Sequence, residues 1–194
     1  MYDNLTRNLG NILQFAEEEL TYFLSLTEVR TFKKYEKIIR IGELVNYVYY
    51  IDKGLVRYYG ETEGKEQTFR VFREDMWFSE YAAFLTRQPS AICIEALETT
   101  ILFRMHFDKM QESYNKAKIF ERLGRKMAEA LFINEVRMTT QRRIKSPEMR
   151  YLELLQNDPE MMRRVPLKYI ASLLGIEPES LSRIRKRTSR TREQ

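Results

Sequence analysis

The fold is decided by the stretch Pro166-Leu-Lys-Tyr-Ile-Ala-Ser-Leu-Leu-Gly-Ile-Glu-Pro-Glu-Ser-Leu-Ser-Arg-Ile-Arg-Lys-Arg187. Its first half places Ile170, Leu173 and Leu174 at helical spacing, which predicts one buried stripe. Gly175 then ends the helix, because the residue just past a helix C-terminus often needs a positive φ that glycine adopts freely. The first half therefore predicts a short helix followed by a glycine turn.

The second half of this stretch predicts another helix. Pro178 suits its first turn, where the missing N–H is not needed. Leu181 and Ile184 are spaced to face inward, and the residues left to face outward are Glu179, Ser180, Ser182, Arg183 and Lys186. An ordinary surface hairpin of two helices has the same apolar spacing. The small residue Ala171 at the crossing, the turn glycine and the basic outer face together favour a helix-turn-helix, whose second helix enters the major groove of DNA.

The excess positive charge of the chain lies in its C-terminal part. Residues 1–138 contain 20 Lys and Arg against 21 Asp and Glu, whereas residues 139–194 contain 13 against 7. A basic segment favours binding to a phosphate backbone through counterion release. A solubilising tail has the same composition, so the charge supports DNA binding only beside the predicted helix pair.

Length and composition exclude several kinds of site. A chain of 194 residues, 43% of them hydrophobic, can bury a core in one larger and one smaller domain. Cys93 and His106 are each the only residue of their type, which excludes an intrachain disulfide, a thiolate cluster and zinc-finger spacing. We interpret His106 as a plain polar residue rather than a haem ligand. We therefore expect no enzyme, no cofactor and no metal site.

The chain is expected to be cytoplasmic and to have no membrane contact. No apolar run approaches the roughly 20 residues that cross a bilayer. The first residues also lack the apolar run of a signal peptide.

The N-terminal two thirds of the chain predict helices followed by strands. Apolar periodicity within Asn11–Ser25 predicts one or two helices. From Val29 to about His106, short runs rich in Val, Ile, Tyr and Phe predict strands at Val48–Ile51, Leu55–Tyr59, Gln67–Phe72, Ala91–Ala96 and Thr100–Arg104. Their close spacing is typical of an antiparallel sandwich or roll. We interpret the many aromatic residues here as core and cross-strand packing.

After Asp108, a candidate N-cap, the chain predicts one long helix. The seam of this helix recurs every three or four positions, at Ile119, Leu123, Met127, Ala130, Leu131, Asn134 and Met138. Such a seam either docks on the strands or pairs with a second copy. We expect pairing, because a two-fold dimer presents two reading helices about 34 Å apart. Ser146-Pro then predicts the cap and first turn of the next helix, with Tyr151, Leu152, Leu154 and Leu155 facing inward.

This order of elements resembles the Crp/Fnr family of dimeric bacterial transcription regulators. The residues that carry the resemblance are Gly42, Gly54, Phe78-Ser-Glu80, Ile170-Ala-Ser-Leu-Leu-Gly175 and Glu179-Ser-Leu-Ser-Arg183. It implies an α+β fold, with an N-terminal antiparallel β-roll of the cyclic-nucleotide-binding kind and flanking helices in residues 1–138. That domain includes a long dimerisation helix at about 108–138. Residues 139–194 would form a winged-helix-like helix-turn-helix domain, with the wing short or absent.

The resemblance also implies roles for the second helix of the pair, the recognition helix at about 178–187. It assigns base contacts to Glu179 and Arg183, since arginine suits guanine and glutamate suits the cytosine amino group. Ser180 lies beside them, where it can reach a base or a phosphate, and we count it among the base contacts. Contacts to the DNA backbone are assigned to Lys168, Ser182, Arg185, Lys186 and Arg187. The implied partners are double-stranded DNA, a second copy of the chain and RNA polymerase. The implied activity is that of a dimeric, sequence-specific transcription regulator.

The β-roll departs from the members of the family that bind cyclic nucleotides. Those members have a cassette resembling Phe-Gly-Glu, followed by Arg-Ser/Thr-Ala, in which the arginine pairs with the cyclic phosphate. Here the matching residues are Phe78-Ser79-Glu80 and Pro89-Ser90-Ala91. A phosphate buried without its cation pays a large desolvation penalty. We therefore expect that cyclic AMP is not the ligand.

The effector and one broader alternative stay open. A candidate pocket for an unknown small-molecule effector comprises Ser79, Glu80, Ser90 and Ala91. A pocket filled by Phe84, Leu85 and their neighbours is the other interpretation. The alternative function is a small-molecule sensor or a regulatory protein-binding subunit with weak or no specific DNA binding.

Overall fold

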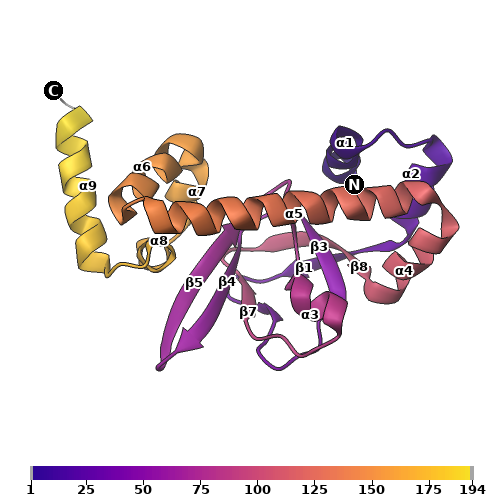
Figure 1. The fold of residues 1–194 in the computed structure, drawn as a ribbon, viewed down its shortest axis with the longest axis horizontal. Coiled ribbons are helices and arrows are strands. Elements are labelled where there is room, and N and C mark those ends of the chain that lie inside the picture. The colour runs from indigo at the N-terminus through magenta and orange to yellow at the C-terminus, as the bar shows by residue number, and fades with distance from the viewer. Residues whose placement is uncertain (1, 193–194) are drawn as a thin grey trace. The chain divides into compact units, whose positions relative to one another are not determined.

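The computed structural model describes residues 2–192 (Figure 1). The chain forms two compact units. The first unit comprises the residues up to Tyr58 together with Val71–Asn134. The second comprises Tyr59–Arg70 together with the residues from Glu135 onward. The β-hairpin of residues 56–72 therefore begins and ends in the first unit, and its far part belongs to the second unit.

Within residues 2–192 the strands form two antiparallel sheets of four strands each. One sheet has the order β1-β8-β3-β6 and the other has the order β2-β7-β4-β5. The strands are β1 (Thr27–Phe32), β2 (Lys37–Ile39), β3 (Tyr47–Lys53), β4 (Val56–Thr62), β5 (Lys65–Phe72), β6 (Trp77–Phe78), β7 (Cys93–Ala96) and β8 (Thr100–His106). The five strands predicted from sequence are confirmed as β3, β4, β5, β7 and β8. The prediction missed β2 and β6 because they are short, and β1 because it is a largely exposed edge strand without an alternating apolar pattern.

Gly54 makes the sharp turn between β3 and β4. Its φ is +113°, and a Cβ at this position would lie 2.4 Å from Thr100 Oγ1 and 2.7 Å from Thr100 Cα. A side chain would therefore meet both conformational strain and a backbone clash. Glycine is required where this turn crosses the start of β8.

Aromatic side chains fill the space between the two sheets. Tyr49 of β3 stacks on Phe78 of β6, with 5.0 Å between ring centroids. Tyr58 of β4 contacts Phe72 of β5 at 4.6 Å and Phe78 at 6.1 Å. Tyr49, Tyr58 and Phe78 are buried, and burial raises the pKa of the Tyr49 hydroxyl. Core packing is confirmed as the role of these aromatic residues.

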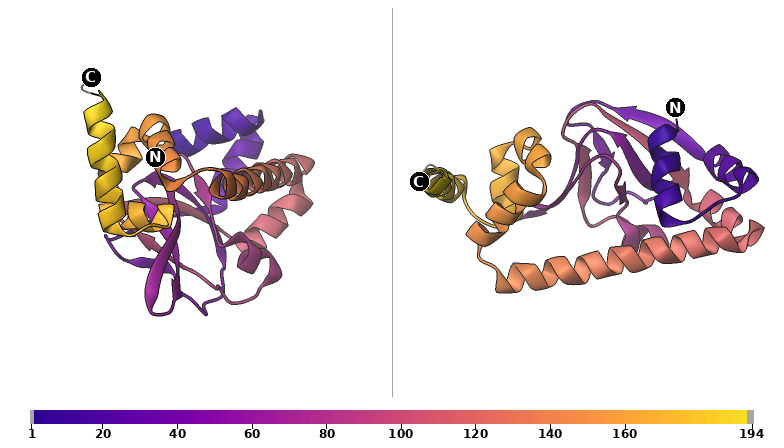
Figure 2. Two further views of the ribbon diagram at one scale, coloured as in Figure 1. Left: turned by 60° about the vertical axis from the view of Figure 1, so that its left-hand side comes forward. Right: turned by 90° about the horizontal axis from the view of Figure 1, so that it is seen from above.

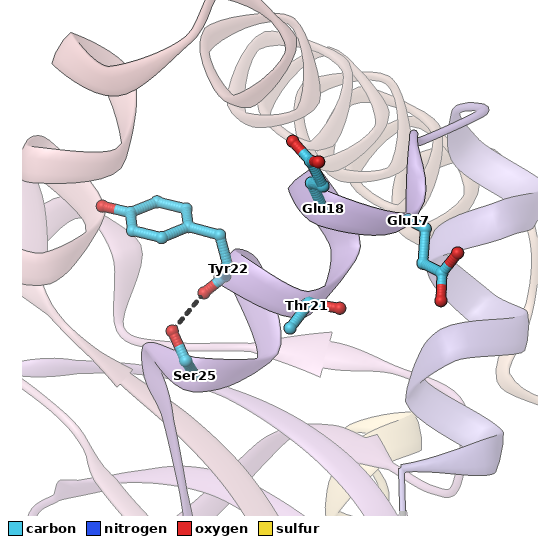
Figure 3. Close-up of a pocket in the computed structure, with 5 residues that line it drawn as sticks. All are labelled: Glu17, Glu18, Thr21, Tyr22 and Ser25. Carbon is cyan, nitrogen blue, oxygen red and sulfur yellow. Dashed lines mark hydrogen bonds between the residues drawn. The ribbon is translucent and has the colours of Figure 1, made fainter.

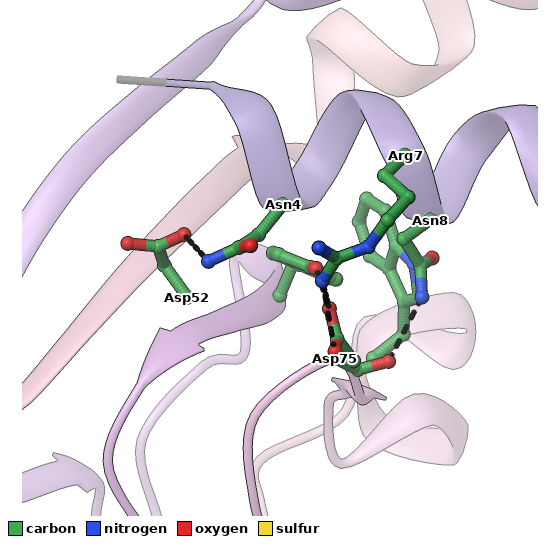
Figure 4. Close-up of polar contacts among 7 residues, drawn as sticks. Asn4, Arg7, Asn8, Asp52 and Asp75 are labelled. Atoms are coloured by element: carbon green, nitrogen blue, oxygen red, sulfur yellow. Dashed lines mark hydrogen bonds and ion pairs between the residues drawn. The ribbon is translucent and has the colours of Figure 1, made fainter.

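Two N-terminal helices, α1 (Asp3–Ile12) and α2 (Glu17–Ser25), precede the strands. Leu5 and Leu9 of α1 are fully buried in the core of the first unit. Polar residues beside them contact the loop before β6, where Asn8 Nδ2 donates to the Asp75 carbonyl oxygen at 2.9 Å and Arg7 pairs with the Asp75 carboxylate at 3.2 Å (Figure 4). Asn4 Nδ2 also donates to Asp52 at 3.1 Å. Apolar and polar contacts together hold α1 on the roll.

The prediction of a single helix over about 108–138 is wrong, because two helices cover this segment. The structure has α4 (Phe107–Lys116) and α5 (Lys118–Ile144), separated by Ala117 in an extended conformation (Figure 2). A Cβ at Gly124 would lie 2.2 Å from Tyr114 Oη, so α4 turns back to pack closely against α5. The N-cap of α4 is His106, whose Nδ1 accepts from the Asp108 backbone N–H at 3.3 Å, and not Asp108 as predicted.

The apolar seam predicted for pairing faces the roll over its first half. Leu123 is 3% exposed within the core of the first unit, and Ile119 and Met127 pack against that core. The apolar residues that α5 exposes are instead Phe132, Ile133, Val136 and Ile144. Both faces of α5 carry apolar residues at helical spacing, so the sequence pattern did not distinguish the face that packs on the roll from the face that is exposed.

The second unit consists of the far part of the β4–β5 hairpin, the end of α5 and four further helices. These helices are α6 (Pro147–Asn157), α7 (Pro159–Arg164), α8 (Leu167–Leu174) and α9 (Pro178–Arg192). Ser146 caps α6 as predicted, since its Oγ accepts from the Met149 backbone N–H at 3.2 Å. Tyr151 is buried, whereas Leu152, predicted to face inward, is 41% exposed. Among the residues described in the two units, no helix is long and apolar enough to span a bilayer.

Candidate nucleic-acid interface

The turn between α8 and α9 has the geometry that its sequence predicts. Gly175 has a φ of +70°, in the left-handed region. The Gly175 N–H donates to the Ser172 carbonyl at 3.0 Å, and the Ile176 N–H donates to the Ala171 carbonyl at 3.0 Å. These two bonds form a Schellman motif, which satisfies carbonyl groups at the helix end. The predicted glycine turn is confirmed.

The inner faces of α8 and α9 are buried against the rest of the second unit. Ile170 and Ala171 are fully buried and Leu174 is 2% exposed, while Leu173 is only half-buried. On α9, Leu181 and Ile184 are buried as predicted. The helix pair therefore has one apolar interior, and the opposite face of α9 is left to solvent.

The exposed face of α9 carries half of the eight residues assigned to DNA. Glu179, Ser182, Arg183 and Lys186 are all exposed. At about 100° of rotation per residue they fall within one arc of the helix, opposite Leu181 and Ile184. The structure thus brings together four of the residues that the sequence singles out.

The remaining assigned residues lie at the margins of this face or outside it. Ser180 is half-buried at the border with the apolar side, and Arg185 is exposed on the other flank. Lys168 is exposed at the start of α8, with its Nζ 4.8 Å from the centre of the Tyr169 ring. This position near the start of α8 suits contact with the DNA backbone.

Arg187 already has a partner in the second unit. Its guanidinium forms a two-point ion pair with Glu148 of α6, at 2.9 Å from Nη2 to Oε2 and 3.3 Å from Nε to Oε1. Both side chains are partly exposed, so the pair contributes little to stability. A DNA phosphate would have to share or displace this carboxylate.

Arg150 of α6 supports the turn, and the sequence analysis did not identify it. Its Nη2 donates at 2.5 Å to the carbonyl of Leu174, which is the last residue of α8. Burial and the nearby Arg142 lower the pKa of this guanidinium. No local signal marks Arg150, because its partner is 24 residues away in the sequence.

The candidate effector residues in the first unit are engaged in local hydrogen bonds. The Glu80 carboxylate caps α3 (Tyr81–Thr86) by accepting from the Ala83 N–H at 2.8 Å. Ser79 Oγ donates to the Tyr47 carbonyl at 2.9 Å. Ser90 is 2% exposed, and its Oγ donates to the Ile92 carbonyl at 2.8 Å. Ala91 is exposed.

Arg87, the arginine nearest the cassette in sequence, is also engaged. Its Nη1 donates to the Val45 carbonyl at 2.8 Å, and its Nη2 donates to Asn46 Oδ1 at 2.7 Å. Its guanidinium lies 4.4 Å from the centre of the Phe107 ring. Phe84 is fully buried and contacts the same ring, at 5.2 Å between centroids, whereas Leu85 is 48% exposed. Phe84 therefore fills the space beside the cassette, and Leu85 does not.

A shallow pocket lies elsewhere, on α2. It is lined by Glu17, Glu18, Thr21, Tyr22 and Ser25 (Figure 3). Ser25 Oγ donates to the Tyr22 carbonyl at 2.7 Å. The pocket includes none of the residues that the sequence analysis singles out.

Comparison with known proteins gives one family match and several similar structures. Residues 29–116 match the family model of the cyclic nucleotide-binding domain. No curated protein sequence matches the chain significantly. Many solved structures are similar, and three that are similar over most of the chain are described next.

The three are bacterial proteins of low sequence identity. CLP, described as a c-di-GMP responsive global regulator of Xanthomonas campestris, is 18% identical with a TM-score of 0.68, over 91% of this chain and 93% of that chain. A CooA mutant from Carboxydothermus hydrogenoformans is 16% identical with a TM-score of 0.69, over 95% and 84%. FixK2 from Bradyrhizobium japonicum is 19% identical with a TM-score of 0.67, over 85% of each chain. Residues 29–116 are therefore similar to a cyclic nucleotide-binding domain, and the chain has the fold of these three solved structures.

Proposed function

We propose that this protein is a sequence-specific DNA-binding transcription regulator. The observation that carries the proposal is the exposed polar and basic face of α9, formed by Glu179, Ser182, Arg183 and Lys186 directly after a left-handed glycine turn. The solved structures with this fold include a global regulator and a catabolite activator protein, which supports the same role. Arg183 would read guanine, Glu179 would accept from a cytosine amino group, and Ser180 would reach the DNA from the border of the face. Lys168, Ser182, Arg185, Lys186 and Arg187 would contact phosphates.

The test is a selection of bound fragments from random or genomic DNA with the purified full chain. We expect a two-fold-symmetric consensus. Arg183→Ala should then lose about 1–3 kcal/mol of binding at one base position in each half-site. Arg143→Ala, which removes an exposed arginine from α5, is the charge-matched control. Equal weakening of all DNA sequences by Arg183→Ala would contradict direct reading by this residue.

We propose that two copies pair through the exposed apolar residues of α5. Phe132 is 69% exposed and Val136, one helical turn later, is 50% exposed, with Ile133 beside them at 56%. Large apolar side chains at this spacing on a long helix suit pairing with the same helix of a second copy. The proposed pairing presents two reading helices to the two halves of a symmetric DNA site.

We further propose that cyclic AMP is not the signal. Pro89 stands where the resemblance places the phosphate-binding arginine, and Arg87 is held by Val45 and Asn46. Glu80 is held by the start of α3. Four aromatic rings also occupy the space between the sheets. Calorimetric titration of the full chain with cyclic AMP and cyclic GMP should show no heat of binding, and saturable binding of either would contradict this proposal.

A further inference from the structure

The far end of the β4–β5 hairpin is hydrogen-bonded to α8. Both segments belong to the second compact unit. Gln67 Nε2 donates to the Ser172 carbonyl at 2.6 Å, and the Thr68 backbone N–H donates to Ser172 Oγ at 2.8 Å. Thr68 is 1% exposed, so water does not compete for its N–H. One serine of α8 thus receives two hydrogen bonds from β5.

Ser172 lies in the last turn of α8, directly before the glycine turn that leads into α9. Its carbonyl also accepts from the Gly175 N–H, which is one of the two bonds of the Schellman turn. The carbonyl of Leu174, two residues later, accepts from Arg150. Carbonyl groups at a helix end need partners from outside the helix. Gln67 and Arg150 supply two of those partners at the turn that leads into the recognition helix.

The hairpin is itself fixed to the last turns of α5. Arg142 Nη2 donates to the Phe69 carbonyl at 2.6 Å. Arg70 forms an ion pair with Glu135 at 2.5 Å, and its guanidinium also lies 2.7 Å from Met138 Sδ. Since the hairpin is held by α5, its bond to Ser172 connects α8 to a fixed support rather than to a free loop.

We propose that Gln67 is a positioning residue for DNA binding, which holds the α8–α9 turn in the conformation that DNA requires. The inference rests on the proposed function. Glu179, Ser182 and Arg183 are exposed while the bond is formed, so the bond leaves the reading face free. A turn that is already ordered loses less conformational freedom when DNA binds. One hydrogen bond of ordinary strength corresponds to a change of about 2- to 10-fold in affinity.

The experiment compares matched variants of the full chain on one selected DNA site. Gln67→Met removes the donor at similar volume and without a charge change, and Gln156→Met makes the same change at an exposed position of α6. We expect Gln67→Met to bind the selected site about 2- to 10-fold more weakly than wild type and Gln156→Met to bind it equally. Gln67→Glu should weaken binding further, because a carboxylate facing the Ser172 carbonyl is repelled, and Gln156→Glu controls for the added negative charge.

Two further readouts separate positioning from general destabilisation. Amide hydrogen exchange of Gly175 and Ile176 should be faster in Gln67→Met than in Gln156→Met. The midpoint temperatures of thermal unfolding of the two variants should be the same. Binding to unrelated DNA should be unchanged, because that binding depends on phosphate contacts. Equal or tighter binding of the selected site by Gln67→Met would overturn the inference while leaving the proposed function intact. Wild-type protein that selects no DNA would overturn the proposed function and the inference with it.

Discussion

At the scale of single residues, the β-roll buries an ion pair in its core. Arg57 of β4 is 1% exposed and Glu95 of β7 is 3% exposed, and the two side chains are hydrogen-bonded. Lys37 of β2 pairs with the same carboxylate. Buried charges are tolerated when they are paired, but the pair often contributes less than an apolar replacement of similar volume. The cluster ties three neighbouring strands of one sheet together.

Removing one charge of this cluster should lower the free energy of unfolding by more than replacing both buried charges with apolar side chains. Glu95→Gln removes the negative charge that Glu95 places beside the buried Arg57 and should lower the free energy of unfolding by about 3–5 kcal/mol. The double variant Arg57→Met with Glu95→Leu removes both buried charges and should lose less than the sum of its single variants. Urea denaturation of wild type, Glu95→Gln, the double variant and its two single variants measures both quantities. Additive losses would show that the two side chains do not depend on each other.

At the scale of elements, a half-buried tyrosine packs α4 against α5. Tyr114 lies directly over Gly124, and burial raises the pKa of Tyr114 to about 12. The neutral phenol is therefore favoured in the folded state. Its contribution to stability is complete below the unfolded pKa of about 10 and is lost as the pH rises from about 10 through about 12.

From this contact we predict how the free energy of unfolding of the first unit depends on pH in the alkaline range. Tyr114→Phe cannot ionise, so its free energy of unfolding should fall less steeply above about pH 10 than that of wild type. Thermal unfolding from pH 8 to 11.5 gives the two profiles, with Tyr35→Phe, at a half-exposed tyrosine, as control. Parallel profiles for wild type and Tyr114→Phe would show that Tyr114 ionises as freely in the folded state as in the unfolded state.

The exposed stripe of α5 makes a second prediction at this scale. Phe132→Glu combined with Val136→Glu places two carboxylates on the face proposed for pairing, so the protein should become monomeric. Sedimentation equilibrium at micromolar concentration measures the mass. Arg125→Glu with Lys126→Glu also adds carboxylates to α5 and is the control. A double variant at Phe132 and Val136 that keeps the mass of wild type would exclude this face as the interface.

At the scale of the whole molecule, the segregation of charge predicts how DNA affinity depends on salt. The segment from residue 139 onward carries the whole excess of positive charge. We expect the logarithm of the binding constant to fall linearly with the logarithm of salt concentration. Lys186→Gln should reduce the slope by about 1, because one phosphate contact is lost. Lys33→Gln, at an exposed lysine after β1, should leave the slope unchanged, and the same change in slope for both variants would assign the effect to net charge alone.

Across the molecule, features that depend on neighbouring residues were predicted correctly from the sequence. Features that depend on contacts between distant residues were not. The glycine turn at Gly175, the cap at Ser146 and five of the strands depend on residues within a few positions of one another. The break at Ala117 was missed because it depends on Tyr114 meeting Gly124. The free face of α5 was misjudged because which face is covered depends on the roll.

By itself, the sequence determined the helix-turn-helix and its outward residues, the β-roll and the place of the positive charge. These features follow from periodicity, from the φ that glycine allows and from composition. Only the tertiary structure decided that Gln67 bonds to Ser172, 105 residues away, that Arg187 pairs with Glu148, and that Phe132 and Val136 are exposed on α5. The physical reason is that such contacts depend on how whole elements pack, and no short-range pattern encodes which surfaces will meet.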